Sequence, residues 1–120
     1  MEHMSMTLRT ATLFIALGFS AATIAAPRGD VAAGKAKAQQ VCAACHGADG
    51  NKTLDSTYPK LAGQYSDYLS KALHDYKSGK RSNAIMVGQA QGLSDKEIAD
   101  LSAYFGSLEA HIHDLSAHAR

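Results

Sequence analysis

A pair of cysteines followed at once by a histidine is the feature of this chain best suited to do chemistry. Residues 42–46 read Cys-Ala-Ala-Cys-His. This spacing is typical of covalent haem attachment, in which each thiol forms a thioether with a vinyl group of the porphyrin. A histidine directly after Cys45 can bind the iron only from the side of the tight loop that carries the thiols. We therefore predict that Cys42 and Cys45 carry one haem c and that His46 is an axial ligand of its iron.

Two other uses of the cysteine pair remain open. A dithiol that cycles to a disulfide is expected in a βαβ context, whereas runs of Val, Ile and Thr at a period of two are missing here. Half of a zinc site would need further ligands. The chain has only two cysteines, and no pair of histidines follows them at the distance along the chain that is found in zinc fingers. Haem attachment is therefore favoured, and a redox dithiol is the main alternative.

The first 25 residues are typical of a secretory signal peptide. Arg9 precedes an apolar run over residues 11–19, and small residues follow as far as Ala26. We expect cleavage after Ala25. A retained membrane anchor is the alternative, but the apolar run is shorter than the roughly 20 residues that cross a bilayer. Export predicts a periplasmic protein, and this agrees with the haem interpretation because bacteria attach c-type haem outside the cytoplasm.

The remainder of the chain has the size of one small domain. We expect a haem domain over residues 26–109 and a polar, histidine-rich tail over residues 110–120. The signal peptide holds one acidic and one basic residue, so the remaining 11 basic and 10 acidic residues give a net charge of +1. A nearly neutral protein offers no electrostatic case for binding nucleic acid. We also expect no membrane span in the mature chain.

Capping residues and hydrophobic periodicity predict three main helices. The first begins after Asp30 and runs toward Val41. The second begins at Ser66 and has an apolar face at helical spacing. The third follows a capping box formed by Ser94 and Glu97. Residues 47–65 lack periodicity, and we expect them to form a long loop over the cofactor.

Met86 is the best candidate for the second axial ligand. It is the only methionine outside the signal peptide, and a thioether is a soft ligand that favours Fe(II). We expect it in a loop after the second helix, from which it can reach the haem face opposite His46. A methionine that fills a gap in the core is the alternative. The rival ligands are His74, His111, His113 and His118.

Several short motifs add to the cysteine pair. They are CAACHG at residues 42–47, YPKLAGQ at 58–64, GKRSNAIM at 79–86 and LSAYF at 101–105, with a glycine at position 34. Over about residues 29–108 the chain thereby resembles the small bacterial class I c-type cytochromes, most closely the single-domain relatives of the dihaem respiratory cytochromes. The resemblance implies an all-α cytochrome c fold, with three to four helices wrapped around one covalently bound haem. It also implies that the N- and C-terminal helices cross where Gly34 meets the region of Leu101 and Tyr104.

The same resemblance implies the axial pair and one supporting contact. His46 and Met86 would bind the iron, and the carbonyl of Pro59 would accept a hydrogen bond from the His46 ring and fix its tautomer. With both axial positions filled, we expect a periplasmic electron-transfer protein rather than an enzyme. A haem subunit of a larger oxidoreductase complex is one alternative, and a haem enzyme or sensor is another if Met86 does not bind.

Redox proteins that donate and accept electrons are the expected partners, and the oligomeric state is left open. Four cationic side chains could form a weak docking rim for acidic partners. A solvated helix face explains the same charges. The four residues are Lys71, Lys77, Lys80 and Arg81.

Overall fold

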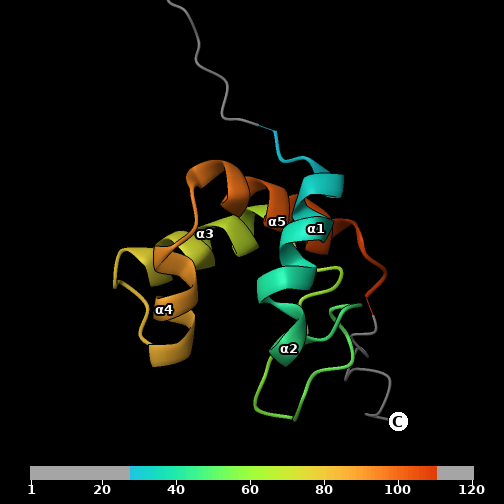
Figure 1. Ribbon diagram of the computed structural model, residues 1–120, viewed down its shortest axis with the longest axis horizontal. Coiled ribbons are helices and arrows are strands. Elements are labelled where there is room, and N and C mark those ends of the chain that lie inside the picture. The colour runs from blue at the N-terminus through green and yellow to red at the C-terminus, as the bar shows by residue number, and fades with distance from the viewer. Residues whose placement is uncertain (1–27, 111–120) are drawn as a thin grey trace, which may run out of the picture.

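Helices form all of the regular secondary structure between residues 28 and 110, the part of the chain that the computed structural model describes. They are α1 (Val31–Val41), α2 (Ala43–His46), α3 (Ser66–Lys77), α4 (Ala84–Gln91) and α5 (Asp95–Ser107) (Figure 1). The all-α prediction is therefore confirmed, with five helices when the single turn of α2 is counted. The predicted signal peptide (1–25) and the tail beyond residue 110 lie outside the described residues. Within the described range, no helix is long and apolar enough to cross a membrane.

Helix α1 crosses α5, as Figure 1 shows on its right side, and the two backbones come close at Gly34. A Cβ atom placed on Gly34 would lie 2.0 Å from the carbonyl oxygen of Asp100 and 2.8 Å from the Cβ of Tyr104. Glycine is therefore required where the two backbones meet. The predicted crossing of the first and last helices at Gly34 is confirmed.

Local signals set the ends of the two crossing helices. The Asp30 carboxylate accepts hydrogen bonds from the first backbone N–H groups of α1, at 2.8 and 3.0 Å. Ser94 and Glu97 form the predicted capping box at the start of α5. The backbone N–H of Asp30 also donates to the buried carboxylate of Asp100 at 2.7 Å. This bond ties the start of α1 directly to the middle of α5.

Among residues 28–110, one hydrophobic core lies between α1, α3 and α5. Ile98 and Leu101 are its most deeply buried large side chains, and both come from the apolar face of α5. The core is completed by side chains from the other elements and from the last turns of α5: Ala38, Leu69, Leu93, Tyr104 and Phe105. Burial of this face accounts for the position of α5 at the centre of the fold.

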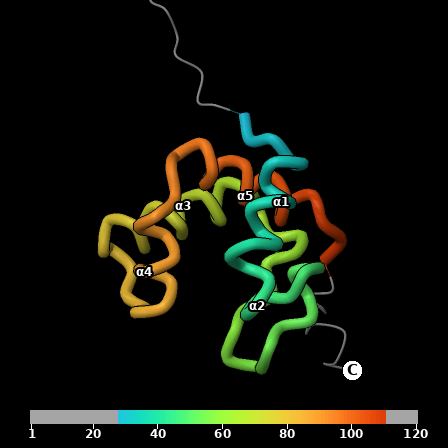
Figure 2. The backbone as a smooth tube through the Cα atoms, viewed as in Figure 1, coloured from blue at the N-terminus to red at the C-terminus, as the bar shows by residue number. Residues whose placement is uncertain are grey.

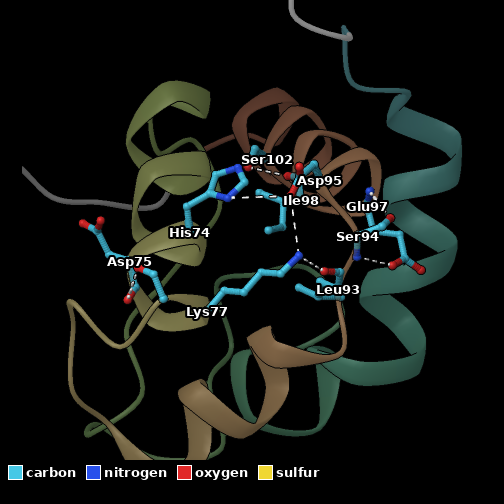
Figure 3. A network of polar contacts seen from close by, with 10 residues as sticks. His74, Asp75, Lys77, Leu93, Ser94, Asp95, Glu97, Ile98 and Ser102 are labelled. Carbon is cyan, nitrogen blue, oxygen red and sulfur yellow. Dashed lines mark hydrogen bonds and ion pairs between the residues drawn. The ribbon is translucent and has the colours of Figure 1, made fainter.

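The junction between α4 and α5 is held against the end of α3 by one lysine (Figure 3). The Nζ atom of Lys77 donates to the carbonyl of Leu93 at 2.6 Å and lies 3.5 Å from a carboxylate oxygen of Asp95. His74, one turn earlier in α3, also faces Asp95, with 3.9 Å between the imidazole and the carboxylate. These contacts fix the C-terminal end of α4 relative to α3.

The loop of residues 47–65 connects α2 to α3 without regular structure, as predicted, and Figure 2 shows its course in green. Gly47 ends α2 with φ of +81°, and a Cβ there would lie 2.2 Å from the carbonyl oxygen of Lys52. Further along, Gly50 accepts backbone hydrogen bonds from Leu61 and Ala62, at 2.8 and 3.1 Å. The loop therefore folds back on itself beside the cysteine pair.

Candidate functional site

One helical turn, rather than the predicted tight loop, carries the two cysteines and the histidine. Cys42 ends α1 and starts α2, and its carbonyl accepts hydrogen bonds from the backbone N–H groups of Cys45 and His46, at 3.2 and 3.0 Å. Positions i, i+3 and i+4 of a helical turn project to the same side. The turn therefore presents both thiols and the imidazole to one cavity, which all three residues line.

His46 is buried, with 6% of its surface exposed, and its orientation is fixed. Its Nδ1 atom lies 2.9 Å from the carbonyl oxygen of Pro59. A carbonyl can only accept, so Nδ1 carries the proton and the lone pair of Nε2 remains for a metal. The ring of Tyr58 packs edge-on beside the imidazole, with 6.1 Å between the centroids of the two rings. The contact that the family resemblance implied for Pro59 is thus present.

Met86 lies in the first turn of α4, not in a loop as the sequence predicted. The side-chain oxygen of Asn83 accepts a hydrogen bond of 3.0 Å from the backbone N–H of Met86 and so caps this helix. Met86 is half-buried and lines the same cavity as His46. Asn83 was missed as a functional residue, although an asparagine directly before an apolar run is a recognisable helix start.

A cavity of about 470 Å³ separates the α2 turn from α4. This volume is typical of a pocket for a ligand of several hundred daltons. Its floor is apolar, with Leu69, Leu73, Leu101 and Phe105 among the lining side chains. Two thiols, an imidazole nitrogen and a thioether sulfur on an apolar cavity are the donor set that a covalently bound haem requires. The residues present therefore fit that group.

The thiol of Cys42 is poorly suited to the alternative role of a redox dithiol. Burial raises its pKa to about 11, a rise that the nearby Lys37 ammonium opposes only in part. A thiol with such a pKa is protonated at neutral pH and is a weak nucleophile. The two cysteines are not joined in a disulfide. The raised pKa of Cys42 therefore weighs against cycling between dithiol and disulfide.

Three of the four cationic residues considered as a docking rim, Lys71, Lys80 and Arg81, lie close enough to Asp75 to lower the pKa of its carboxyl group. Lys71 pairs with Asp75, and Lys77 is bound to the α4–α5 junction. Arg81 lines the cavity, whereas Lys80 is exposed and outside the cavity lining. Of the rival iron ligands, His74 is engaged with Asp95 outside the cavity, and the other three lie outside the described residues.

Comparison with known proteins gives a consistent result. The family model for cytochrome c matches residues 31–109. Cytochrome c4 of Pseudomonas aeruginosa is 51% identical over 96 residues, which are 80% of this chain and 46% of that protein. Cytochrome c-554(548) of Halomonas halodenitrificans is 46% identical over 84 residues, covering 68% of this chain and 99% of that protein.

A solved structure agrees with these sequence matches. Reduced recombinant cytochrome c4 from Pseudomonas stutzeri superposes with a TM-score of 0.62 and 42% identity, over 68% of this chain and 46% of that chain. The chain thus spans about half the length of the cytochrome c4 proteins it matches. It spans nearly the whole of cytochrome c-554(548).

Proposed function

The chain belongs to the cytochrome c family, and we propose that it carries single electrons between redox proteins. The spacing of Cys42 and Cys45, together with the family match, indicates one covalently bound haem c. A haem c supplies one-electron exchange between Fe(III) and Fe(II). The observation that carries the proposal is that one cavity is lined by the two thiols and His46 from α2 and by Met86 from α4.

Each residue has a separate task in this proposal. Cys42 and Cys45 would form the two thioethers, and His46 Nε2 and the Met86 sulfur would be the axial ligands. The hydrogen bond from His46 Nδ1 to Pro59 holds the imidazole in the ligating tautomer and makes Nε2 more basic. The Met86 thioether would stabilise Fe(II) and thereby raise the reduction potential.

Electron transfer is favoured over catalysis because protein atoms would fill both axial positions. An iron with no free position does not bind oxygen or peroxide, so we propose that the protein is not an enzyme. We further propose that it works in the periplasm, since residues 1–25 have the pattern of a signal peptide. Its partners would be one electron donor and one electron acceptor.

Visible spectroscopy of the exported protein tests the attachment. We expect haem that survives denaturation and a sharp low-spin spectrum after reduction. Cys42→Ala or Cys45→Ala should weaken or abolish the covalent link. Unchanged covalent staining in both variants, or no haem in a maturation-competent host, would contradict the proposal.

Met86→Ala tests the axial ligand. We expect loss of the ferric methionine–iron charge-transfer band and binding of added carbon monoxide by the reduced protein. The midpoint potential should fall by on the order of 100 mV, within the roughly 0.8 V over which axial ligands tune haem iron. Val87→Ala is the matched control, because Val87 is the next residue of α4, is half-buried and does not line the cavity. If Met86→Ala matches Val87→Ala in its charge-transfer band, carbon monoxide binding and midpoint potential, Met86 is not a ligand. Binding of carbon monoxide by the unmodified protein would favour a sensor or an enzyme.

A further inference from the structure

The charges around the cavity are of one sign. Among the described residues, the charged side chains that line it are Lys60 and Arg81, and no aspartate or glutamate does so. A cavity with an apolar floor and only cationic side chains is suited to a ligand that carries negative charge at its rim. Haem has two carboxylate side chains, the propionates. The cavity therefore offers cations of the sign that these carboxylates need.

Arg81 is contacted by two tyrosines, and its charge also helps to lower the pKa of the Asp75 carboxyl group. Its Nη1 atom donates to the hydroxyl oxygen of Tyr68 at 3.2 Å, and its guanidinium carbon lies 5.0 Å from the centre of the Tyr76 ring. Its backbone N–H donates to the carbonyl of Asp75 at 3.0 Å. Within residues 28–110 no ion pair joins Arg81 to an acidic side chain. The hydrogen bond with Tyr68 raises the pKa of the guanidinium further.

This arrangement orients the guanidinium and leaves donors available. Arginine has five N–H donors in a planar fork, and one of them is used by Tyr68. Tyr76 contacts the guanidinium with its ring face and also contributes a hydrogen bond, so the two tyrosines use two of the five donors and three remain. A planar edge with two parallel N–H groups matches a carboxylate. An ammonium such as that of Lys60 is a point charge without this geometry.

We propose that Arg81, positioned by Tyr68 and Tyr76 at the rim of the cavity, binds a propionate carboxylate of the haem and thereby sets part of the reduction potential. The inference rests on the proposed function, because it requires the covalent haem. Pairing neutralises a negative charge near the iron. Removal of the guanidinium leaves that charge unpaired, which favours Fe(III) and lowers the midpoint potential.

Redox titration of Arg81→Gln over a range of pH tests the inference. Arg81 is exposed, so solvent screening limits the effect. We expect the Fe(III)/Fe(II) equilibrium to shift about threefold to tenfold toward Fe(III), where tenfold corresponds to about 59 mV for one electron. The unpaired propionate also has a higher pKa than the paired one. The variant should therefore show a potential that falls with rising pH in the mildly acidic range, where the unmodified protein is flat.

Lys80→Gln is the matched control, since it removes one positive charge from the neighbouring exposed position outside the cavity lining. Arg81→Lys keeps the charge but not the fork, so it should shift the potential in the same direction by less. It also serves as the test if Arg81→Gln does not fold. An Arg81 variant that matches Lys80→Gln in potential and pH profile would overturn the inference. A larger shift in Lys60→Gln than in Arg81→Gln would overturn it as well.

The two proposals fail in different ways. Absence of covalent haem from the unmodified protein would refute the proposed function. Covalent haem with normal axial ligation, combined with no specific effect of Arg81 on the potential, would refute only the role of Arg81.

Discussion

Gly34→Ala should destabilise the domain even though alanine is the better helix former. The substitution adds one methyl group at the point where α1 crosses α5. Its Cβ would lie 2.0 Å from the carbonyl oxygen of Asp100, whereas ordinary contact begins at 3.4 Å, so the helices would have to move apart by about 1.4 Å. A backbone carbonyl in the middle of a helix cannot rotate away. The strain must therefore be taken up by the packing of Leu101 and Tyr104.

Two opposing terms set the size of the effect. Overpacking a close contact costs about 1–3 kcal/mol, and contact with backbone places this case at or slightly above the upper end. Alanine contributes about 1 kcal/mol in favour of the helix. We expect a net loss of about 2 kcal/mol in the free energy of unfolding. Urea denaturation of the haem-loaded protein, followed by far-ultraviolet circular dichroism, measures this difference.

Gly88→Ala is the matched control for this experiment. Gly88 lies inside α4, and a Cβ there would meet no atom within 4 Å. The control should therefore gain up to about 1 kcal/mol from helix propensity alone. If Gly34→Ala is as stable as the unmodified protein, or gains as Gly88→Ala does, the close contact between α1 and α5 does not limit the fold.

Two further predictions concern a cap and an ion pair. Asn83→Ala removes the cap of α4 and should lower the stability of this helix by about 1 kcal/mol. The methionine–iron charge-transfer band should therefore disappear at a lower temperature than in the unmodified protein. Loss of the band at the same temperature in both proteins would contradict this. Contacts with Lys37 and with the backbone of Ser94 lower the pKa of Glu97 from 4.5 to about 2. Because the folded pKa is the lower one, its stabilisation is present above about pH 4.5 and is lost as the pH falls toward 2. Glu97→Gln should therefore flatten the pH dependence of stability in that interval, and an unchanged slope in acid unfolding would refute the assignment.

The elements that the sequence predicted well are those with local signals. Asp30 and the Ser94–Glu97 capping box define helix starts through contacts within three residues, and both are found as expected. The motif at residues 42–46 is likewise local, since its chemistry depends on residue types and spacing. These features could be recognised without knowing what packs against them.

The features that were missed depend on tertiary context. Helix α4 contains Gly88 and has no clear apolar face, so its sequence reads as a loop; the Asn83 cap and packing against α3 nevertheless make it helical. The cysteine turn was predicted as a loop because nothing in its four residues shows that α1 continues almost directly into it. Arg81 looked like a surface charge because its sequence position does not show that the segment after α3 brings it against Tyr68 and Tyr76 of that helix.

The contact between α1 and α5 also bears on the order in which the parts of the chain can fold. Asp30 and Asp100 are hydrogen-bonded across 70 positions of sequence, and Gly34 lies against α5, the last helix of the described residues. An isolated helix of 11 residues such as α1 is marginal in water. The turn that carries Cys42 and Cys45 continues from α1, so it gains a rigid support only when α5 has packed against α1. Until then both thiols belong to an open chain and are accessible to the enzymes that attach haem.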